Sequence, residues 1–182
     1  MYHSVGLKKD GGIVTWGDDD DDENQRDGSP KEAGYIAIAC GHFHSVALKS
    51  DGTIVTWGDN TYNQRDNSPI DNRYVAIACG FSHSVALKED GTIVTWGYNP
   101  FHRHVPPKIG KYIAIACGGY HSVALKSDCT IVTWGSQRKD SPIDNGYIAI
   151  ACGSLHSVAI KSDGSIVTWG NNDENQRDNS LV

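Results

Sequence analysis

The stretch HSVALKSDGTIVTWG, which runs from His44 to Gly58, decides the fold of this chain. In residues 44–49 the larger side chains His, Val and Leu alternate with Ser, Ala and Lys, which is the two-residue period of a β-strand. Residues 53–57 are rich in β-branched side chains, which favour strands. Asp51-Gly52 between the two segments supplies the positive φ of a tight turn. The stretch therefore predicts an antiparallel β-hairpin.

The hairpin recurs five times along the 182 residues, at intervals of roughly 35 to 41 residues. Its copies begin at His3, His44, His83, His121 and His156 and end at Gly17, Gly58, Gly97, Gly135 and Gly170. Four copies follow an apolar segment of the type YIAIAC, residues 35–40, which is read as a further strand. On that strand we expect Ile36, Ile38 and Cys40 on one face and Tyr35, Ala37 and Ala39 on the other.

Sheets with two apolar faces must pack against the neighbouring copy, and a ring protects the sheets at both ends. The repeats thus predict an all-β fold, a β-propeller of about five three-stranded blades. We expect one domain, 1–182, with units at about 1–34, 35–73, 74–111, 112–146 and 147–182. A β-solenoid is the competing architecture, but its coils commonly have about 20 to 30 residues and lack this hairpin. Because the first unit lacks the YIAIAC strand, the ring is expected to be incomplete or open.

The fourth hairpin departs from the others, because Cys129 follows Asp128 where the other copies have glycine. A side chain in the left-handed conformation costs about 1 kcal/mol. We expect either this strain or a rebuilt turn.

The order ACGxxHSVALK, then DGTIVTWG, then Asn-x-x-Asn-Gln resembles the repeat of the regulator of chromosome condensation family, over almost the whole chain. The short units resemble the branch whose blades have three strands. This resemblance implies a propeller that binds other proteins. The family usually continues Gly-Gln-Leu-Gly where this chain has Asn63-Gln64-Arg65-Asp66, so the shape of that loop is open. The family's rings are typically seven-bladed, so a five-bladed ring, an incomplete arc and a truncated product all remain alternatives.

Composition excludes several classes of partner. The chain has 16 Lys and Arg, 22 Asp and Glu, and a net charge of −6. It lacks a basic stripe for successive phosphates, so we expect no direct binding of nucleic acid. Its apolar runs are far shorter than the roughly 20 residues of a membrane helix, and we find no signal peptide. Five cysteines without a signal peptide indicate free thiols and an intracellular location, the cytoplasm with the nucleus as alternative.

The repeated histidines and cysteines do not suggest a catalytic or metal site. One histidine per blade cannot converge on one ion, so we expect each to make a hydrogen bond that stabilises its repeat. Four cysteines, Cys40, Cys79, Cys117 and Cys152, are read as small buried hydrophobes. Ser follows His in every copy, and neighbours on a strand point to opposite faces, which argues against a catalytic dyad. We therefore expect no catalytic residue, no metal, no cofactor and no enzyme activity.

In near-identical repeats, specificity must come from the positions that differ. These are the two residues between Gly and His and the loops 59–73, 98–111 and 136–146. Aromatic and arginine residues are the usual anchors of protein interfaces. The predicted partner-binding residues are His42, Phe43, Tyr62, Phe81, Phe101, Arg103, Tyr120 and Leu155.

Three functions remain open at this stage. The repeats favour a non-catalytic scaffold for protein–protein interaction, with a homodimer through open propeller edges as one form of association. The resemblance raises guanine-nucleotide exchange or regulation of a small GTPase as an alternative. It also raises inhibition of a hydrolase, because bacterial propellers of the short-repeat branch inhibit β-lactamases.

Overall fold

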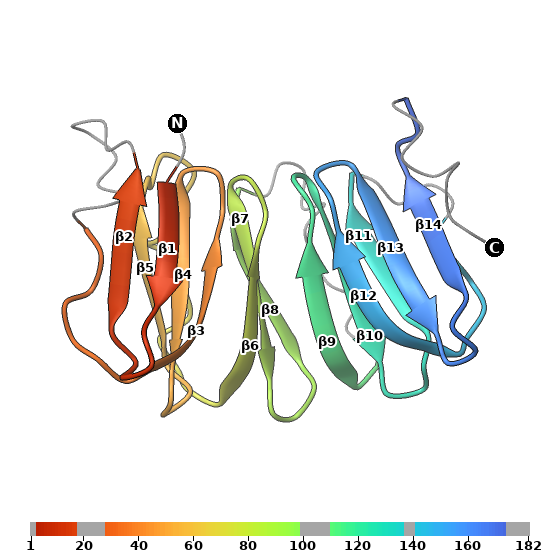
Figure 1. Cartoon of the computed structure of the whole chain (residues 1–182), viewed down its shortest axis with the longest axis horizontal. Coiled ribbons are helices and arrows are strands. Elements are labelled where there is room, and N and C mark those ends of the chain that lie inside the picture. Colours follow the sequence, from red (N-terminus) through yellow and green to blue (C-terminus); the bar gives the residue numbers. More distant parts are fainter. Residues whose placement is uncertain (1–2, 18–27, 99–109, 137–140, 174–182) are drawn as a thin grey trace.

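The computed structural model describes residues 3–17, 28–98, 110–136 and 141–173. Within these ranges every regular element is a β-strand, and no helix is present that could span a membrane. The strands form five separate sheets that stand side by side, from β1 and β2 at one end to β12, β13 and β14 at the other (Figure 1). The all-β propeller architecture predicted from the repeats is confirmed.

Four sheets have three strands and the first has two. The inner strands are β3 (Tyr35–Cys40), β6 (Tyr74–Cys79), β9 (Tyr112–Cys117) and β12 (Tyr147–Cys152). The middle strands are β1 (His3–Leu7), β4 (His44–Lys49), β7 (His83–Lys88), β10 (His121–Lys126) and β13 (His156–Lys161). The outer strands are β2 (Ile13–Gly17), β5 (Ile54–Gly58), β8 (Ile93–Gly97), β11 (Ile131–Gly135) and β14 (Ile166–Gly170). All pairs are antiparallel, and each middle strand pairs with its outer strand in the same register.

The faces predicted for the inner strand are wrong at its start. The register of β3 against β4 shifts between Tyr35 and Ala37, which marks a β-bulge. The extra residue turns Ile36 outward, where it is exposed, and brings buried Tyr35 onto the same face as Ile38. The same bulge recurs in β6 and β12, so it is a property of the repeat.

The hairpin turns have the predicted geometry, including the one without glycine. Gly52 has φ 81°, and Cys129 has φ 64°. The Cys129 amide donates to the Lys126 carbonyl at 3.0 Å, as the Gly52 amide donates to Lys49 at 3.0 Å. The fourth turn is therefore not rebuilt, and the cysteine adopts the left-handed conformation.

Replacing Cys129 with glycine is expected to raise the free energy of unfolding by up to about 1 kcal/mol, because glycine adopts this conformation without a Cβ clash. Chemical denaturation followed by tryptophan fluorescence measures the change. The reverse substitution, Gly164→Cys, is the matched control, since Gly164 has φ 86° and open space around its missing Cβ. It should lower stability by a similar amount; equal stabilities for both variants and the parent would contradict the strain.

The hydrophobic core lies between adjacent sheets. Val46 and Leu48 on one face of β4 pack against Tyr74, Ala86 and Trp96 of the next blade. The equivalent residues of the following blades repeat this contact. Each interface joins the face that carries His and Val in one blade to the face that carries Tyr and Trp in the next.

A histidine–serine hydrogen bond crosses every interface between described blades. The pairs and their Nε2–Oγ distances are His3–Ser45 at 2.7 Å, His44–Ser84 at 2.8 Å, His83–Ser122 at 3.0 Å and His121–Ser157 at 2.8 Å. The expectation of one stabilising hydrogen bond per histidine is confirmed for these four. The partner serine belongs to the next blade, because Ser and His of one copy point to opposite faces.

Candidate protein-interaction face

The loops that join inner to middle strands lie together at one end of the blades. They are linked by backbone hydrogen bonds that run from blade to blade. The amide of His42 donates to the Phe81 carbonyl at 3.1 Å, that of Phe81 to Gly119 at 3.0 Å, and that of Gly119 to Ser154 at 2.8 Å. This ladder holds the two variable residues of each loop in fixed positions relative to the neighbouring blades.

The variable residues form a continuous aromatic row, which we define as His42, Phe43, Phe81 and Tyr120. The His42 ring centroid lies 4.1 Å from that of Phe43 and 5.2 Å from that of Phe81. Phe81 and Tyr120 meet edge to face at 5.0 Å. Edge-to-face and tilted contacts at these distances are favourable for aromatic rings. Tyr120 is 45% exposed, so the row presents aromatic surface to solvent.

Gly119 allows the row to pass from one blade to the next. A Cβ at this position would lie 3.1 Å from the Phe81 ring and 3.1 Å from the Ser154 carbonyl. Glycine thus makes room for Phe81 to reach Tyr120 across the blade boundary. Sequence reasoning named the ring residues but missed this glycine, whose only signal was its place among larger residues in equivalent loops.

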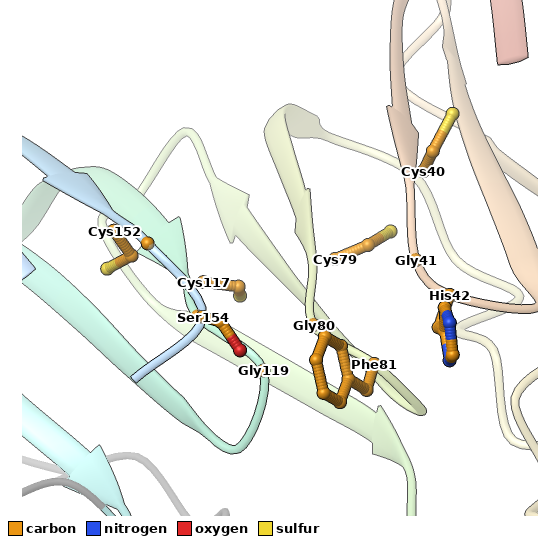
Figure 2. A pocket seen from close by; sticks show the side chains of 12 residues that line it. Cys40, Gly41, His42, Cys79, Gly80, Phe81, Cys117, Gly119, Cys152 and Ser154 are labelled. Carbon is orange, nitrogen blue, oxygen red and sulfur yellow. The ribbon is translucent and has the colours of Figure 1, made fainter. Parts of the chain in front are cut away.

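Beside the row lies a hollow of about 330 Å³ between the inner strands. Its wall repeats one pattern, the Cys-Gly pair that ends each inner strand and the residue that follows it. Figure 2 shows the four cysteines on successive inner strands, with the His42 and Phe81 rings beside the following glycines. The prediction that these cysteines are buried hydrophobes is wrong for Cys40, which is exposed, and the other three are half-buried because they line the hollow.

The thiols that line the hollow are held in their neutral form. Burial raises the pKa of Cys79 to about 12 and that of Cys152 to about 11, and it raises the pKa of Cys117 well above its ordinary value. The Sγ atoms of all three lie 3.6 Å from the hydroxyl oxygen of a serine on the middle strand. A protonated thiol is a poor nucleophile and metal ligand. These three thiols therefore bring no charge to the hollow near neutral pH.

A second aromatic pair lies outside the row at the same end of the blades. The rings of Tyr62 and Tyr98 are 4.7 Å apart and both are exposed. The Tyr98 amide donates to the Ser82 carbonyl at 2.8 Å, which places Tyr98 next to the loop that joins β6 to β7. Tyr98 was not among the predicted binding residues, although the loop that begins with it, 98–111, was predicted to contribute to specificity.

The loop after β5 takes its shape from a buried glutamine. Gln64 is fully buried, and its side chain accepts from the Tyr62 amide at 2.8 Å and donates to Asp59 at 3.0 Å. The backbone carbonyl of Gln64 accepts a hydrogen bond from the Trp96 indole nitrogen at 2.9 Å. Asn63 provides the left-handed residue, with φ 59°. Asparagine therefore supplies the left-handed conformation that glycine adopts most easily, and the hydrogen bond from the Tyr62 amide to Gln64 ties Tyr62 to this loop.

The predicted binding residues fall into three groups. The structure joins His42, Phe43, Phe81 and Tyr120 in the row, and it places Tyr62 beside Tyr98. Leu155 is half-buried in the loop that joins β12 to β13. Phe101 and Arg103 lie outside the described residues.

Three of the four histidine–serine pairs are buried between sheets, so they have the distances of a catalytic dyad but not its access. His44, Ser84, His121 and Ser157 are at most 1% exposed. No substrate can reach a pair enclosed between two sheets. Among the described residues, no three His, Cys, Asp or Glu side chains are arranged to hold a metal ion.

The repeat, the blades and their interfaces define a repeat-built β-propeller. A family model described as the regulator of chromosome condensation (RCC1) repeat matches residues 35–64, 74–103, 112–139 and 147–176. The chain belongs to this family. A search of curated protein sequences found no match.

Solved structures show the same fold at low sequence identity. The ectodomain of receptor kinase CR4 from Physcomitrella patens has 21% identity and a TM-score of 0.77, covering 93% of this chain and 48% of its own. The ACR4 ectodomain from Arabidopsis thaliana has 23% identity and a TM-score of 0.75, covering 93% and 62%. Prp20p from Saccharomyces cerevisiae has 20% identity and a TM-score of 0.72, covering 92% and 56%. The chain spans about half the length of these structures.

Proposed function

We propose that this chain is a non-catalytic protein–protein interaction module that binds its partner at the end of the blades carrying the aromatic row. One observation carries the proposal: the repeats are near-identical, yet their non-repeated residues converge there into contacting rings. Side chains that vary between equivalent positions and remain accessible are the ones that can select a partner.

The arrangement of the row favours tight binding. Aromatic side chains contribute much of the energy of protein interfaces, most of all near a well-packed centre. The backbone ladder between His42, Phe81, Gly119 and Ser154 fixes the row before binding. A preformed surface loses less conformational entropy when the complex forms.

The rest of this end also supports binding over catalysis. Burial keeps the pKa of the thiols of Cys79, Cys117 and Cys152 high, so no thiolate faces the hollow near neutral pH. Prp20p, which has the same fold, has binding properties toward Gsp1p and histones.

We also propose a reducing, intracellular compartment, because the five cysteines are free thiols. A homodimer through the open end blades stays a prediction.

The double variant Phe81→Ala/Tyr120→Ala is expected to weaken partner binding by about tenfold or more, because it removes two contacting rings from the row. A photo-crosslinking amino acid at position 120 identifies the bound protein, and surface plasmon resonance with that purified protein measures Kd. The matched control is Ile70→Ala/Ile143→Ala, since both isoleucines are fully exposed and lie outside the row.

The control should bind like the parent, and the row variant should keep the parent's unfolding midpoint. Equal Kd values for the parent and the row variant would refute the proposed surface. Nucleotide release from purified small GTPases should be unchanged when the chain is added. Faster release would instead favour the exchange-factor alternative.

A further inference from the structure

An ion pair recurs at the end of the blades that carries the hairpin turns. In the second blade the Lys49 Nζ lies 3.1 Å from the Glu32 carboxylate, which also accepts a hydrogen bond from the Tyr35 hydroxyl at 3.0 Å. The Lys49 ammonium stands over the Tyr35 ring, 5.5 Å from its centroid. One carboxylate thus joins the last residue of the middle strand to the first residue of the inner strand.

Two further blades repeat this triad of acid, tyrosine and lysine. The triads are Asp71 with Tyr74 and Lys88, and Asp144 with Tyr147 and Lys161. In both, the lysine Nζ lies 5.2 Å from the centroid of the tyrosine ring. The acid stands three residues before the tyrosine in all three blades. The repeat therefore defines a place for one carboxylate at this end of a complete blade.

The blade of β9, β10 and β11 keeps the lysine of this triad but lacks the acid. Lys126 ends β10, whereas residue 109, three positions before Tyr112, is isoleucine. The Lys126 side chain runs over Gly110, because a Cβ at Gly110 would lie 2.9 Å from the Lys126 Cε. Over the part of the chain that the structure describes, Lys126 makes no ion pair. The lysine is thus in place without the carboxylate.

The neighbouring parts of the chain do not supply the missing carboxylate. The connection 98–111, which corresponds to the segments that bring the acid in the other blades, contains three Lys or Arg residues and no Asp or Glu. In the adjacent turn, the Asp128 carboxylate accepts from the Thr130 amide at 3.0 Å and from the Thr130 hydroxyl at 2.6 Å. Described blades flank this blade on both sides (Figure 1), and their acids pair with their own lysines.

The place of the missing acid is cationic, although the whole chain has a net charge of −6. Lys111 adds a second positive charge there. The Ser127 amide donates to the Lys111 carbonyl at 2.9 Å, so Lys111 lies beside the β10–β11 turn, where it is exposed. Lys126 itself is half-buried. A half-buried ammonium group gains from a carboxylate at hydrogen-bond distance, since burial has removed part of its hydration.

We propose that this blade binds a side-chain carboxylate of an acidic partner protein at Lys126, in the place that Glu32, Asp71 and Asp144 fill in the other complete blades. Opposite charges at an interface favour the encounter and fix its register. The site lies at the opposite end of β10 from Tyr120 and the aromatic row. It therefore does not rest on the proposed function, and substitutions in the row should leave it unchanged.

The probe is a short, fluorescently labelled peptide of alternating Glu and Ser with an amidated C-terminus. It is titrated into the full chain in low-salt buffer, where exposed charges are screened least, and its anisotropy is measured. A second peptide has Gln in place of every Glu. The Glu peptide should bind, and the Gln peptide should bind at least about fivefold more weakly, because it has no carboxylate to pair with Lys126.

Four variants test the place of binding. Lys126→Gln should weaken binding of the Glu peptide about fivefold. Lys161→Gln is the matched control, because it removes the same charge but Lys161 already pairs with Asp144, so binding should stay close to that of the parent. Ile109→Asp restores the acid of the repeat and should weaken binding as much as Lys126→Gln does. Ile109→Asn adds no charge and should bind like the parent. The unfolding midpoint shows that each variant still folds.

Carbodiimide coupling locates the bound carboxylate. The reagent joins a lysine amine to a carboxylate in contact with it as an amide and takes up the water that is lost. Mass spectrometry of the coupled complex should find the peptide linked to Lys126 in preference to Lys161.

Several outcomes would overturn the inference. Failure of the Glu peptide to bind, or equal binding of the Glu and Gln peptides, would show that no carboxylate is recognised. Equal weakening by Lys126→Gln and Lys161→Gln would reduce binding to the overall charge. Coupling of Lys126 to a carboxylate of the chain or of a second copy, before peptide is added, would show that the place is filled without a partner.

Discussion

Gly80→Ala should lower the free energy of unfolding by about 3 kcal/mol, a large effect for a single methyl group. The added Cβ would lie 2.1 Å from Cε1 of His83 and 2.6 Å from the Gly118 carbonyl of the next blade. His83 cannot move aside, because its Nε2 is held by Ser122 at 3.0 Å. The backbone of the next blade cannot retreat without breaking the interface. Urea denaturation followed by tryptophan fluorescence measures the loss.

The matched control is Gly153→Ala in the last blade, which has the same local sequence pattern. There the three nearest atoms to the added Cβ all belong to the His156 ring, which is only half-buried and can turn away. We expect a loss of about 1 kcal/mol or less. If both variants lost the same stability, the contact between blades would not be the reason for glycine at this position.

Acidification from pH 6.5 to pH 4 should lower the free energy of unfolding by on the order of 3 kcal/mol through His44 alone. Desolvation by burial lowers the pKa of His44 to about 4, with a smaller contribution from His3. In the unfolded chain the same imidazole has its ordinary pKa near 6.5. Protons therefore bind the unfolded state first, and the stability present above pH 6.5 is lost as the pH falls toward 4.

The structure explains why the proton is so unfavourable in the folded state. His44 is fully buried, its Nε2 pairs with Ser84, and its Nδ1 has no hydrogen-bond partner among the described residues. Protonation would add an unpaired N–H and a charge between two sheets.

Denaturation curves between pH 4 and pH 8 test this prediction, with His44→Gln as the control. Glutamine can bond to Ser84 but does not titrate, so the variant should show a shallower pH dependence by about one proton. Asp71 adds a separate pH dependence. Hydrogen bonds hold its pKa below the ordinary value, so its contribution to stability is present at pH 7 and is lost only as the pH falls through that lowered pKa. Identical slopes for parent and variant above pH 4 would contradict the assignment to His44.

The strands and turns were predictable because their causes are local. Alternation in HSVALK and the Asp-Gly pair depend on neighbouring residues and recur five times, so each copy confirms the others. The inner-strand bulge was not predictable from the same alternation. It arises because Tyr35 pairs with Lys49 and also packs into the core against the preceding blade, which only the assembled sheets reveal.

The candidate site was predictable in its residues but not in its contacts. Variation among copies singled out Phe81 and Tyr120, but their edge-to-face contact depends on the step from one blade to the next. It also depends on Gly119, which leaves room for the ring. No spacing along the chain encodes that step, so Tyr98 and the pairing of Tyr62 with it were missed.

By itself, the sequence determined the β-hairpin and its repetition along the chain, because periodicity and turn chemistry act between residues close in the chain. The tertiary structure alone decided the partner of each histidine, since the hydroxyl that it meets lies about forty residues away on the next blade. It also decided which surfaces stay open. The aromatic row stays accessible because it lies at the end of the blades, whereas Trp57, Trp96, Trp134 and Trp169 are buried between blades.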